Sequence, residues 1–339
     1  MKVVVAPDSY KGCLSVAEVC STLADALSDL HPGWTVVECP LADGGEGTVE
    51  TILPAVGGTF CEAVVSDPLG RPVAARYGMK GETAFIEVAE ACGLKHLCCD
   101  ELDPLHATSY GVGELLMAAR ERGAARFVVG LGGTATCDGG VGMMKVEGLR
   151  EALEGCTVDL LCDVVNPFTG QYGAARVFAP QKGASVEDVE LLEKRMQAMA
   201  FGIFAETGVD VRHLEGAGAA GGLGGAMMAY FGAQSVSGIE RILEIIGFDD
   251  LTEGAELIVT GEGKSDLQTL GGKVPYGVLK HSKGIPVGLV SGRIEDREAL
   301  LAAGFEKLVQ VTPEGMHLHE ALKKENAMRN LRSAVISIA

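Results

Sequence analysis

Positive charge is scarce in this sequence of 339 residues. It has 28 Lys and Arg against 46 Asp and Glu, a formal net charge of −18. Nucleic acids and anionic membrane surfaces are bound through concentrated Lys and Arg, so the balance argues against both kinds of partner. No basic segment followed by a long apolar stretch opens the chain, so no export signal is predicted and we expect a cytoplasmic protein.

Paired cysteine motifs are also missing. The ten cysteines are scattered and form no CxxC pair, which argues against a zinc knuckle or a thioredoxin-like site and favours buried, reduced thiols. The uncharged stretch 216–233 is mostly glycine in its first half, which would make a poor membrane-spanning helix. We expect a glycine loop that leads into a packed helix.

Glycine, by contrast, is abundant, at 47 residues, and 47% of the chain is hydrophobic. That composition is globular, and so much glycine indicates many tight turns and close backbone approaches. A chain of this length is too long for one ordinary core, so two domains are expected.

The first sixty residues repeat a strand–loop–helix unit. The segment 2–6, "KVVVA", reads as a buried parallel strand, and Ser15 with Glu18 forms a capping box that begins a helix. A second strand is expected at 34–40, and after a glycine-rich loop a second helix at 49–53.

The pattern changes after Gly57. Short, partly alternating strands separated by turn signals predict antiparallel pairing over 59–90. A helix at 112–123 then leads into a strand at 126–133, and Ser185 with Asp188 caps a long helix that ends near Thr207.

Strands at Leu257, Val287 and Lys307 alternate with helices, which is parallel-sheet organisation. The predicted fold class is therefore α/β. A Rossmann-like parallel-sheet domain is built from both chain ends (1–57 and 240–339), and a second α/β domain (58–239) is inserted between them. Residues 106–140 could instead belong to the first domain.

Three polar, glycine-rich loops follow predicted strands: "PDSYKG" (7–12), "LADGGEG" (41–47) and "TGEGKSD" (260–266). In open parallel sheets, ligands collect beyond the carboxyl ends of the strands. Lysine can neutralise phosphate, a carboxylate can hold Mg²⁺ or accept a hydroxyl proton, and glycine exposes backbone N–H groups. The loops together predict phosphoryl transfer.

Each loop also has a purely structural interpretation. Asp8 or Ser9 could form a turn and cap, the Asp-Gly pairs at Asp43 and Asp138 could be tight turns, and Lys11 could be a solvated surface charge. Two formal motifs fail. The GxGxxG at 216–221 follows no convincing strand, and the P-loop ending at 263–265 lacks its first glycine.

Two further segments hold candidate ligands. The loop 130–138, "GLGGTATCD", offers backbone amides and hydroxyls to an anion or adenine nucleotide, or is only a strand that turns sharply. Segment 162–185 carries Asp163, Asn166 and Lys182 among turn residues. His317 and His319 lack an identifiable third ligand, so a helix start or surface segment is favoured over a metal site.

These motifs resemble those of the type 1 glycerate kinase family. The matching stretches span nearly the whole chain in the family's order, among them "APDSYKG", "PLADGGEGTVE", "GLGGTATCDGGVGMM", "CDVVNPFTG", "FAPQKGA", "GAGAAGGLGG" and "TGEGKSDLQTLGGKVP". The resemblance implies ATP- and Mg²⁺-dependent phosphorylation of D-glycerate to 2-phosphoglycerate in an interdomain cleft, by a monomer or homodimer. Formation of 3-phosphoglycerate by a glycerate 3-kinase is the alternative regiochemistry.

Carried over residue by residue, the resemblance implies three sets of site residues. The catalytic set is Asp8, Lys11, Asp43 and Asp266, with Asp43 and Asp266 as candidate metal ligands. The nucleotide set is Gly132, Gly133, Thr134, Thr136, Glu262 and Lys264. The glycerate set is Ser9, Gly44, Gly45, Glu46, Asp138 and Asn166.

The chain departs from the family pattern after Met144, where relatives generally have about 20 to 30 more residues before "CDV". A strand or flap of the inserted domain is therefore expected to be missing. That shortening motivates a second hypothesis, a noncatalytic sensor that binds glycerate or nucleotide without turnover.

Overall fold

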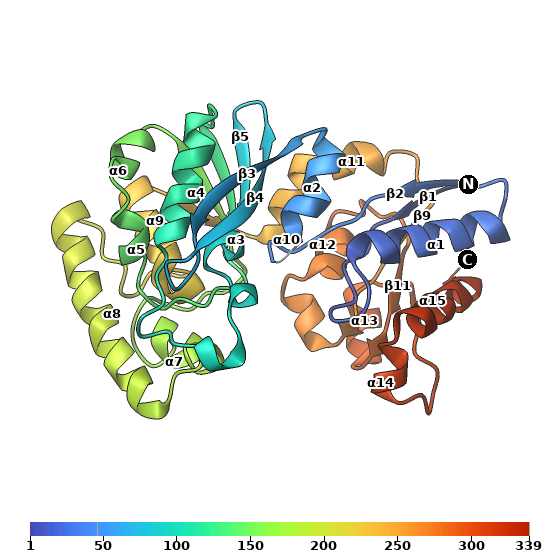
Figure 1. Ribbon diagram of the computed structural model, residues 1–339. Helices are drawn as coiled ribbons and strands as arrows, with labels where there is room; N and C mark the ends of the chain where they lie inside the picture. The colour runs from blue at the N-terminus through green and yellow to red at the C-terminus, as the bar shows by residue number, and fades with distance from the viewer. Residues whose placement is uncertain (46, 339) are drawn as a thin grey trace. The chain divides into compact units, whose positions relative to one another are not determined.

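The computed structural model describes residues 1–45 and 47–338 (Figure 1). Its internal contacts divide the chain into two compact units. Unit 1 comprises Met1–Asp43 and Ile239–Ala339, and unit 2 comprises Gly44–Gly238. Each unit has its own sheet and its own core, so the two are described separately.

Unit 1 is built on a five-stranded sheet in the order β13-β11-β9-β1-β2, with every pair parallel. The central strands are short apolar runs buried on both faces, as parallel strands in α/β proteins are. The strands are β1 (Lys2–Val5), β2 (Thr35–Glu38), β9 (Leu257–Thr260), β11 (Val287–Ser291) and β13 (Lys307–Gln310), and a two-stranded ladder joins β10 (Lys264–Ser265) to β12 (Arg293–Ile294).

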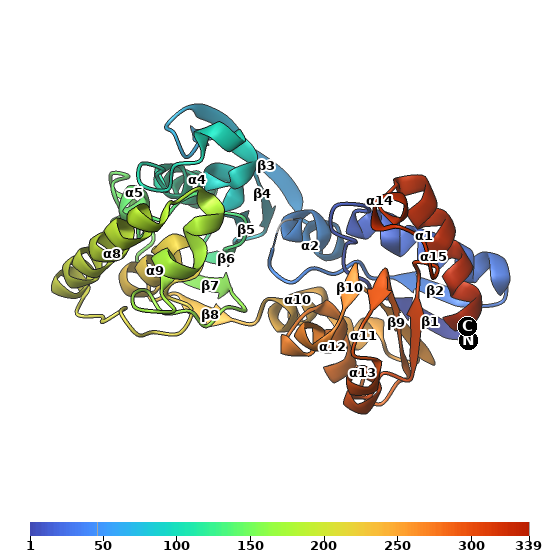
Figure 2. The same ribbon diagram turned by 90° about the horizontal axis from the view of Figure 1, so that it is seen from below.

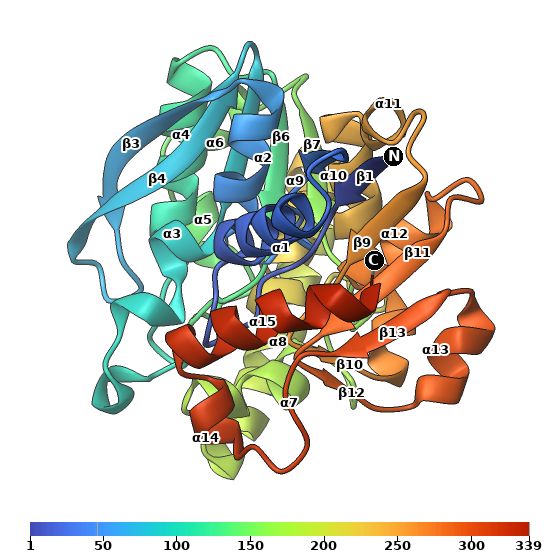
Figure 3. The same cartoon turned by 90° about the vertical axis from the view of Figure 1, so that its right-hand side faces the viewer.

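Helices cover both faces of this sheet. On one face α1 (Val16–Leu30) and α15 (Lys324–Ile338) lie side by side (Figure 3) and share a core with Val3, Val259 and Val290. The capping box predicted for Ser15 and Glu18 begins α1 and is confirmed. Figure 2 shows α12 and α13 on the opposite face. The remaining helices are α10 (Gly238–Ile246), α11 (Phe248–Leu251), α12 (Val274–Lys280), α13 (Arg297–Ala303) and α14 (Leu318–Ala321).

The strand order of unit 1 reverses between β1 and β9. From β1 the chain continues to β2 on one side, whereas β9, β11 and β13 follow one another on the other side. In doubly wound sheets this reversal opens a crevice beyond the carboxyl ends of the two strands, where ligands bind. The loops that begin after β1 and after β9 carry the predicted site residues Asp8 and Glu262.

Unit 2 contains a six-stranded mixed sheet in the order β3-β4-β5-β6-β7-β8. The antiparallel pairing predicted for 59–90 is confirmed, because β3, β4 and β5 pair antiparallel, whereas β5 to β8 pair parallel. The strands are β3 (Thr59–Ser66), β4 (Pro72–Lys80), β5 (Thr83–Glu87), β6 (Arg126–Gly130), β7 (Thr157–Leu161) and β8 (Gln234–Val236).

The helices of unit 2 include the long helix predicted from Ser185 and Asp188, whose capping box is present. The stretch 216–233 is the expected glycine loop followed by a largely buried helix, α9. The helices are α2 (Thr48–Val56), α3 (Ala89–Cys92), α4 (Tyr110–Glu121), α5 (Val141–Met144), α6 (Leu149–Ala152), α7 (Ala174–Phe178), α8 (Val186–Thr207) and α9 (Leu223–Phe231). Across residues 1–45 and 47–338, no helix combines the length and apolarity needed to cross a membrane.

Unit 2 begins earlier than the domain boundary expected at Gly57. Helix α2 packs on β4 and β5, and a Cβ atom at Gly58 or Gly78 would lie 2.4 or 2.6 Å from Cδ1 of Leu53. Glycine at both positions therefore admits the Leu53 side chain and holds α2 against the second sheet. Residues 106–140, for which two assignments were open, supply α4 and β6 to unit 2.

Candidate active site

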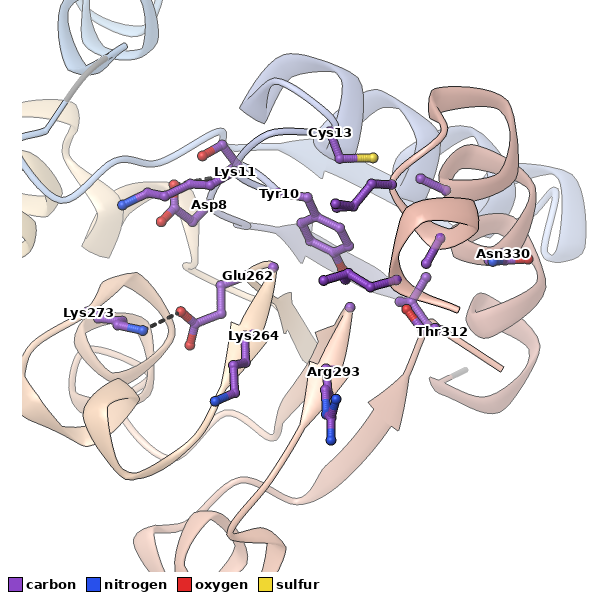
Figure 4. A pocket seen from close by; sticks show the side chains of 18 of the residues that line it. Asp8, Tyr10, Lys11, Cys13, Glu262, Lys264, Lys273, Arg293, Thr312 and Asn330 are labelled. Atoms are coloured by element: carbon purple, nitrogen blue, oxygen red, sulfur yellow. Dashed lines mark hydrogen bonds and ion pairs between the residues drawn. The ribbon is translucent and has the colours of Figure 1, made fainter. Parts of the chain in front are cut away.

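The carboxyl edge of the unit 1 sheet contains a pocket of about 390 Å³. The loops after β1, β2, β9, β11 and β13 line it, together with α14 and the first turns of α15. Figure 4 shows Tyr10 and Arg293 in the middle, Thr312 and Asn330 at one end, and the other labelled charged side chains gathered at the opposite end. All three loops singled out in the sequence contribute to this pocket, through Asp8 to Lys11, Asp43, and Glu262 to Lys264.

Asp8 lies at the charged end and is largely withdrawn from solvent, with 8% of its surface exposed. Its Oδ1 accepts a hydrogen bond of 2.6 Å from the backbone N–H of Ser9. Burial raises the pKa of Asp8 to about 6, and the negative charge of Asp43 adds to that increase. A carboxyl group with such a pKa is largely ionised at neutral pH and retains more basicity than an ordinary aspartate, as a general base requires.

Lys11 and Asp43 form the solvent-facing side of this end. Lys11 Nζ lies 3.9 Å from Oδ2 of Asp43, and the Lys11 side chain is 78% exposed. An exposed pair at that distance contributes little to stability. Lys11 is therefore able to exchange its protein partner for an anionic ligand.

Glu262 is buried beneath the pocket and fully hydrogen-bonded. Its Oε1 accepts from the hydroxyls of Ser265 (3.0 Å) and Thr269 (2.6 Å), and its Oε2 lies 3.1 Å from Nζ of Lys273. A buried carboxylate needs such donors, because burying an unpaired charge is costly. Glu262 consequently fixes Lys273 at the pocket wall.

Asp266 has structural contacts at both oxygens. Its Oδ1 caps the turn at Leu267 by accepting from the N–H of Gln268 (2.9 Å), and its Oδ2 lies 3.1 Å from Nζ of Lys264. The hydrogen bond from Lys264 is the main cause that lowers the pKa of Asp266. Lys264 also lies 3.0 Å from Glu295, and these two carboxylates raise the pKa of its ammonium group.

The donor set at the charged end fits Mg²⁺ of the kind that is held partly by substrate. Asp8 and Asp43 repel each other electrostatically, and a cation near them would relieve that repulsion. Mg²⁺ bound together with phosphates takes one or two protein carboxylates and keeps several waters. In the part of the chain that the structure describes, no group of three or more His, Cys, Asp or Glu forms a cage that could hold a metal alone.

Several predicted residues lie in unit 2, where their contacts differ in kind. Gly44 has a φ of +94°, and a Cβ there would lie 2.7 Å from Cβ of Leu161, so the site requires glycine for packing. The carbonyl of Gly45 accepts from the N–H of Thr48 at 3.3 Å. Glu46 lies outside the described residues.

The glycine–threonine loop of unit 2 turns its hydroxyls inward. Thr134 and Thr136 are buried, and Nζ of the equally buried Lys182 donates to Oγ1 of Thr134 (3.0 Å) and to the carbonyl of Thr136 (2.7 Å). Desolvation lowers the pKa of Lys182. Gly132 and Gly133, the other predicted nucleotide ligands of this loop, are exposed.

Asp138 and Asn166 are held by their own unit. One carboxylate oxygen of Asp138 accepts from the N–H and hydroxyl of Ser109 and from the N–H of Gly142, at 2.8 to 3.0 Å, and the other accepts from the N–H of Gly140 at 3.1 Å. Asn166 donates its amide to the carbonyl of Tyr172 at 2.8 Å.

Sequence reasoning did not single out Lys273 or the far end of the pocket. Lys273 lies within the quoted stretch "TGEGKSDLQTLGGKVP", but only its ion pair with Glu262 distinguishes it from a surface lysine. The other missed residues are Arg293 and Thr312, which come after β11 and β13, and Asn330, which lies on α15. None of them belongs to a glycine-rich motif. The common signal was position: each lies at the carboxyl edge of a predicted parallel sheet.

Comparisons with known proteins show the family to which the chain is similar. The sequence profile described as the glycerate kinase family matches residues 3–150 and 144–339. The two matched ranges overlap at residues 144–150, and the shortening was expected directly after Met144. The glycerate kinase of Bacillus subtilis (strain 168) is 37% identical over 373 aligned residues, covering 100% of this chain and 98% of that protein. The glycerate 2-kinase of Escherichia coli (strain K12) is 36% identical over 375 residues, with the same coverage.

A solved structure gives the same result for the fold. It is a crystal structure of a Salmonella typhimurium LT2 protein provisionally described as glycerate kinase 2, with a TM-score of 0.87 and 38% sequence identity, covering 100% of this chain and 97% of that chain. An α/β fold whose sheet edge gathers carboxylates and lysines, in a chain similar over its full length to kinases, defines a phosphotransferase enzyme. The chain belongs to the glycerate kinase family.

Proposed function

We propose that this enzyme transfers the γ-phosphoryl group of ATP to the 2-hydroxyl of D-glycerate, which gives 2-phosphoglycerate and ADP. The observation that carries the proposal is the pocket in unit 1 where carboxylates and ammonium groups meet beyond the strand ends. The name of the Escherichia coli relative supports the 2-position. The expected position of the reaction in an interdomain cleft stays a prediction.

Asp8 is the proposed general base. As the 2-hydroxyl oxygen forms its bond to the γ-phosphorus, the bond from that phosphorus to the bridging oxygen of ADP breaks, and the hydroxyl proton passes to the Asp8 carboxylate. Burial that raises the pKa of this group to about 6 supports the assignment. The cap and ion pair of Asp266 favour a positioning role for it, through Lys264.

Lys11, Lys264 and Lys273 are proposed to balance the charge of the transferring phosphoryl group. Each lines the pocket and is paired with a carboxylate of unit 1, and the buried carboxylate of Glu262 keeps Lys273 in place. When bound, Mg²⁺ would supply further neutralisation of phosphate charge, and Asp43, beside the base at Asp8, would hold it. Positioning and charge neutralisation account for most of the rate in such reactions.

Of the predicted glycerate ligands, Ser9 lines this pocket. We propose that its hydroxyl contacts glycerate, beside the base at Asp8. The corresponding roles of Gly44, Gly45, Glu46, Asp138 and Asn166 stay predictions.

Phosphorus-31 NMR of the product formed from Mg-ATP and D-glycerate tests the proposal. A 2-phosphoglycerate resonance is expected. A 3-phosphoglycerate resonance would keep the kinase and correct the position to that of a glycerate 3-kinase. Absence of either product, together with a glycerate-induced rise in Tm, would instead support the noncatalytic sensor.

A further inference from the structure

The pocket of unit 1 continues beyond the charged residues into an apolar end. Tyr10 stands between the two ends (Figure 4), and its hydroxyl donates to the carbonyl of Val290 at 2.9 Å, which fixes the ring as a wall. The apolar end is lined by the loop after β13, by α14 and by α15, and Cys13 lines the pocket near Tyr10 (Figure 4). Its residues are Val311, Thr312, Leu318, Ala321, Leu322, Ala327 and Asn330.

Two large leucines at this end face solvent. Leu318 is 72% exposed and Leu322 is 42% exposed, whereas Ala321 and Ala327 beside them are buried. Leucine side chains at the mouth of a pocket give up water-exposed apolar area when a flat apolar ligand enters, which favours binding. Ala321 and Ala327 also line this end, and their small side chains leave room for such a ligand.

One polar group at this end has only a weak partner. The Asn330 side chain is buried, and its Nδ2 contacts Sδ of Met316 at 3.4 Å. A thioether is a weak acceptor, so the Asn330 amide gains from exchanging it for a ring nitrogen or carbonyl of a ligand. A carboxamide offers both a donor and an acceptor, as recognition of a nucleobase edge requires.

We propose that the apolar end of this pocket binds the purine base of the nucleotide, with Leu318 and Leu322 against the ring and Asn330 at its edge. The ribose then passes Tyr10, and the phosphates reach Lys11, Lys264 and Lys273 at the charged end. This assignment rests on the proposed function, because it requires a nucleotide substrate. A volume of about 390 Å³ is within the range of small-molecule sites.

The alternative position for the nucleotide is the loop 130–138 of unit 2. Its hydroxyls at Thr134 and Thr136 are buried, and Lys182 occupies the Thr134 hydroxyl and the Thr136 carbonyl. That loop offers a nucleotide chiefly the backbone at Gly132 and Gly133. Unit 1 offers cations, an apolar surface and an edge-reading amide in one pocket.

Calorimetric binding of ADP and of pyrophosphate to the full chain separates base from phosphate recognition. The double variant Leu318→Ala/Leu322→Ala is expected to weaken ADP binding about tenfold and to leave the Kd of pyrophosphate unchanged within about twofold. Leu301→Ala on α13 is the matched control, because Leu301 is 48% exposed and does not line the pocket. Equal Kd values for ADP in both variants would overturn the proposal.

Thiol footprinting gives a second readout on the unaltered protein. Cys13 lines the pocket and is partly exposed, while Cys98 and Cys99 are exposed in unit 2 and serve as internal references. ADP is expected to slow alkylation of Cys13, measured by peptide mass spectrometry, without slowing that of Cys98 or Cys99. Unprotected Cys13 at saturating ADP would place the nucleotide elsewhere.

The two proposals fail separately. ADP binding that depends on Leu318 and Leu322, without glycerate-dependent release of ADP from ATP, would retain the base site and overturn the glycerate kinase reaction. If glycerate is phosphorylated but the Kd of ADP does not change in Leu318→Ala/Leu322→Ala, the reaction would be retained and the base site overturned.

Discussion

The ammonium group of Lys273 lies 3.1 Å from Oε2 of Glu262, and the Glu262 carboxylate is buried. Glu262→Gln removes the charge that holds Lys273 and leaves a neutral amide among the donors of Ser265 and Thr269. We expect the free energy of unfolding to fall by about 1–3 kcal/mol, since hydrogen bonds to buried charged groups contribute that much. Urea denaturation measures the change.

The matched control for Glu262 is Glu295→Gln. Glu295 also pairs with a lysine of the pocket, Lys264, but its side chain is 41% exposed. Exposed pairs contribute less than about 1 kcal/mol, so this variant should unfold at nearly the same denaturant concentration as the parent. A loss at Glu295 as large as that at Glu262 would contradict the role assigned to burial.

Asp8 predicts the pH dependence of the reaction. A base must be ionised, so kcat/KM is expected to fall below a pH of about 6, the pKa to which burial raises this group in the free enzyme. Asp8→Asn should lower kcat about a hundredfold or more and abolish that acidic limb. An unchanged limb in Asp8→Asn would assign the titration to another group.

The same pKa has a consequence for stability. Because the folded state raises the pKa of Asp8 above its unfolded value, its contribution is fully present below the unfolded pKa and is lost as pH rises through about 6. Between pH 4 and pH 8 the parent should lose up to about 3 kcal/mol from this group, and Asp8→Asn should not. Tm measured across that range for both proteins tests the difference.

Asp43 and Asp266 were both predicted as metal ligands, and their contacts distinguish them. Asp43 lies beside Asp8 and Lys11, whereas Asp266 caps a turn and holds Lys264. Asp43→Asn is expected to raise the Mg²⁺ concentration for half-maximal activity about tenfold or more, since it removes a carboxylate ligand. Asp266→Asn, which keeps an oxygen for the cap, should change that concentration little. The reverse order would restore Asp266 as the metal ligand.

Much of this architecture could be predicted from local sequence patterns. The helix beginning at Ser15 and the antiparallel pairing after Gly57 follow from side chains close together in the chain. The attachment of α2 to the second sheet could not be predicted, because it depends on a contact between Leu53 of α2 and Gly78 of β4, which are distant in the sequence. Likewise, Asp8 and Glu262 were identified from their loops, but Asn330 reaches the pocket only through the packing of α15.

A variant at Thr134 tests whether the glycine–threonine loop stabilises the fold or binds the nucleotide. Thr134→Val removes the hydroxyl that accepts from the buried ammonium of Lys182. The free energy of unfolding should fall by about 1–3 kcal/mol, because a buried charged donor loses a partner. The KM for ATP should stay within about twofold of the parent value. A large rise in that KM with unchanged Tm would support the nucleotide site predicted for this loop.

Gly44 offers a comparison between crowding and backbone strain. Its φ is +94°, and a Cβ would lie 2.7 Å from Cβ of Leu161, whereas Gly47 has a φ of +86° with nothing within 4 Å of its Cβ position. Gly44→Ala should therefore cost about 1–3 kcal/mol more than Gly47→Ala, which has only the backbone cost of a left-handed conformation. Calorimetric melting of both variants measures the difference. Equal losses would show that Leu161 moves aside without cost. If Gly44→Ala melts like the parent yet raises the KM for D-glycerate, the residue contacts substrate as the family resemblance implies.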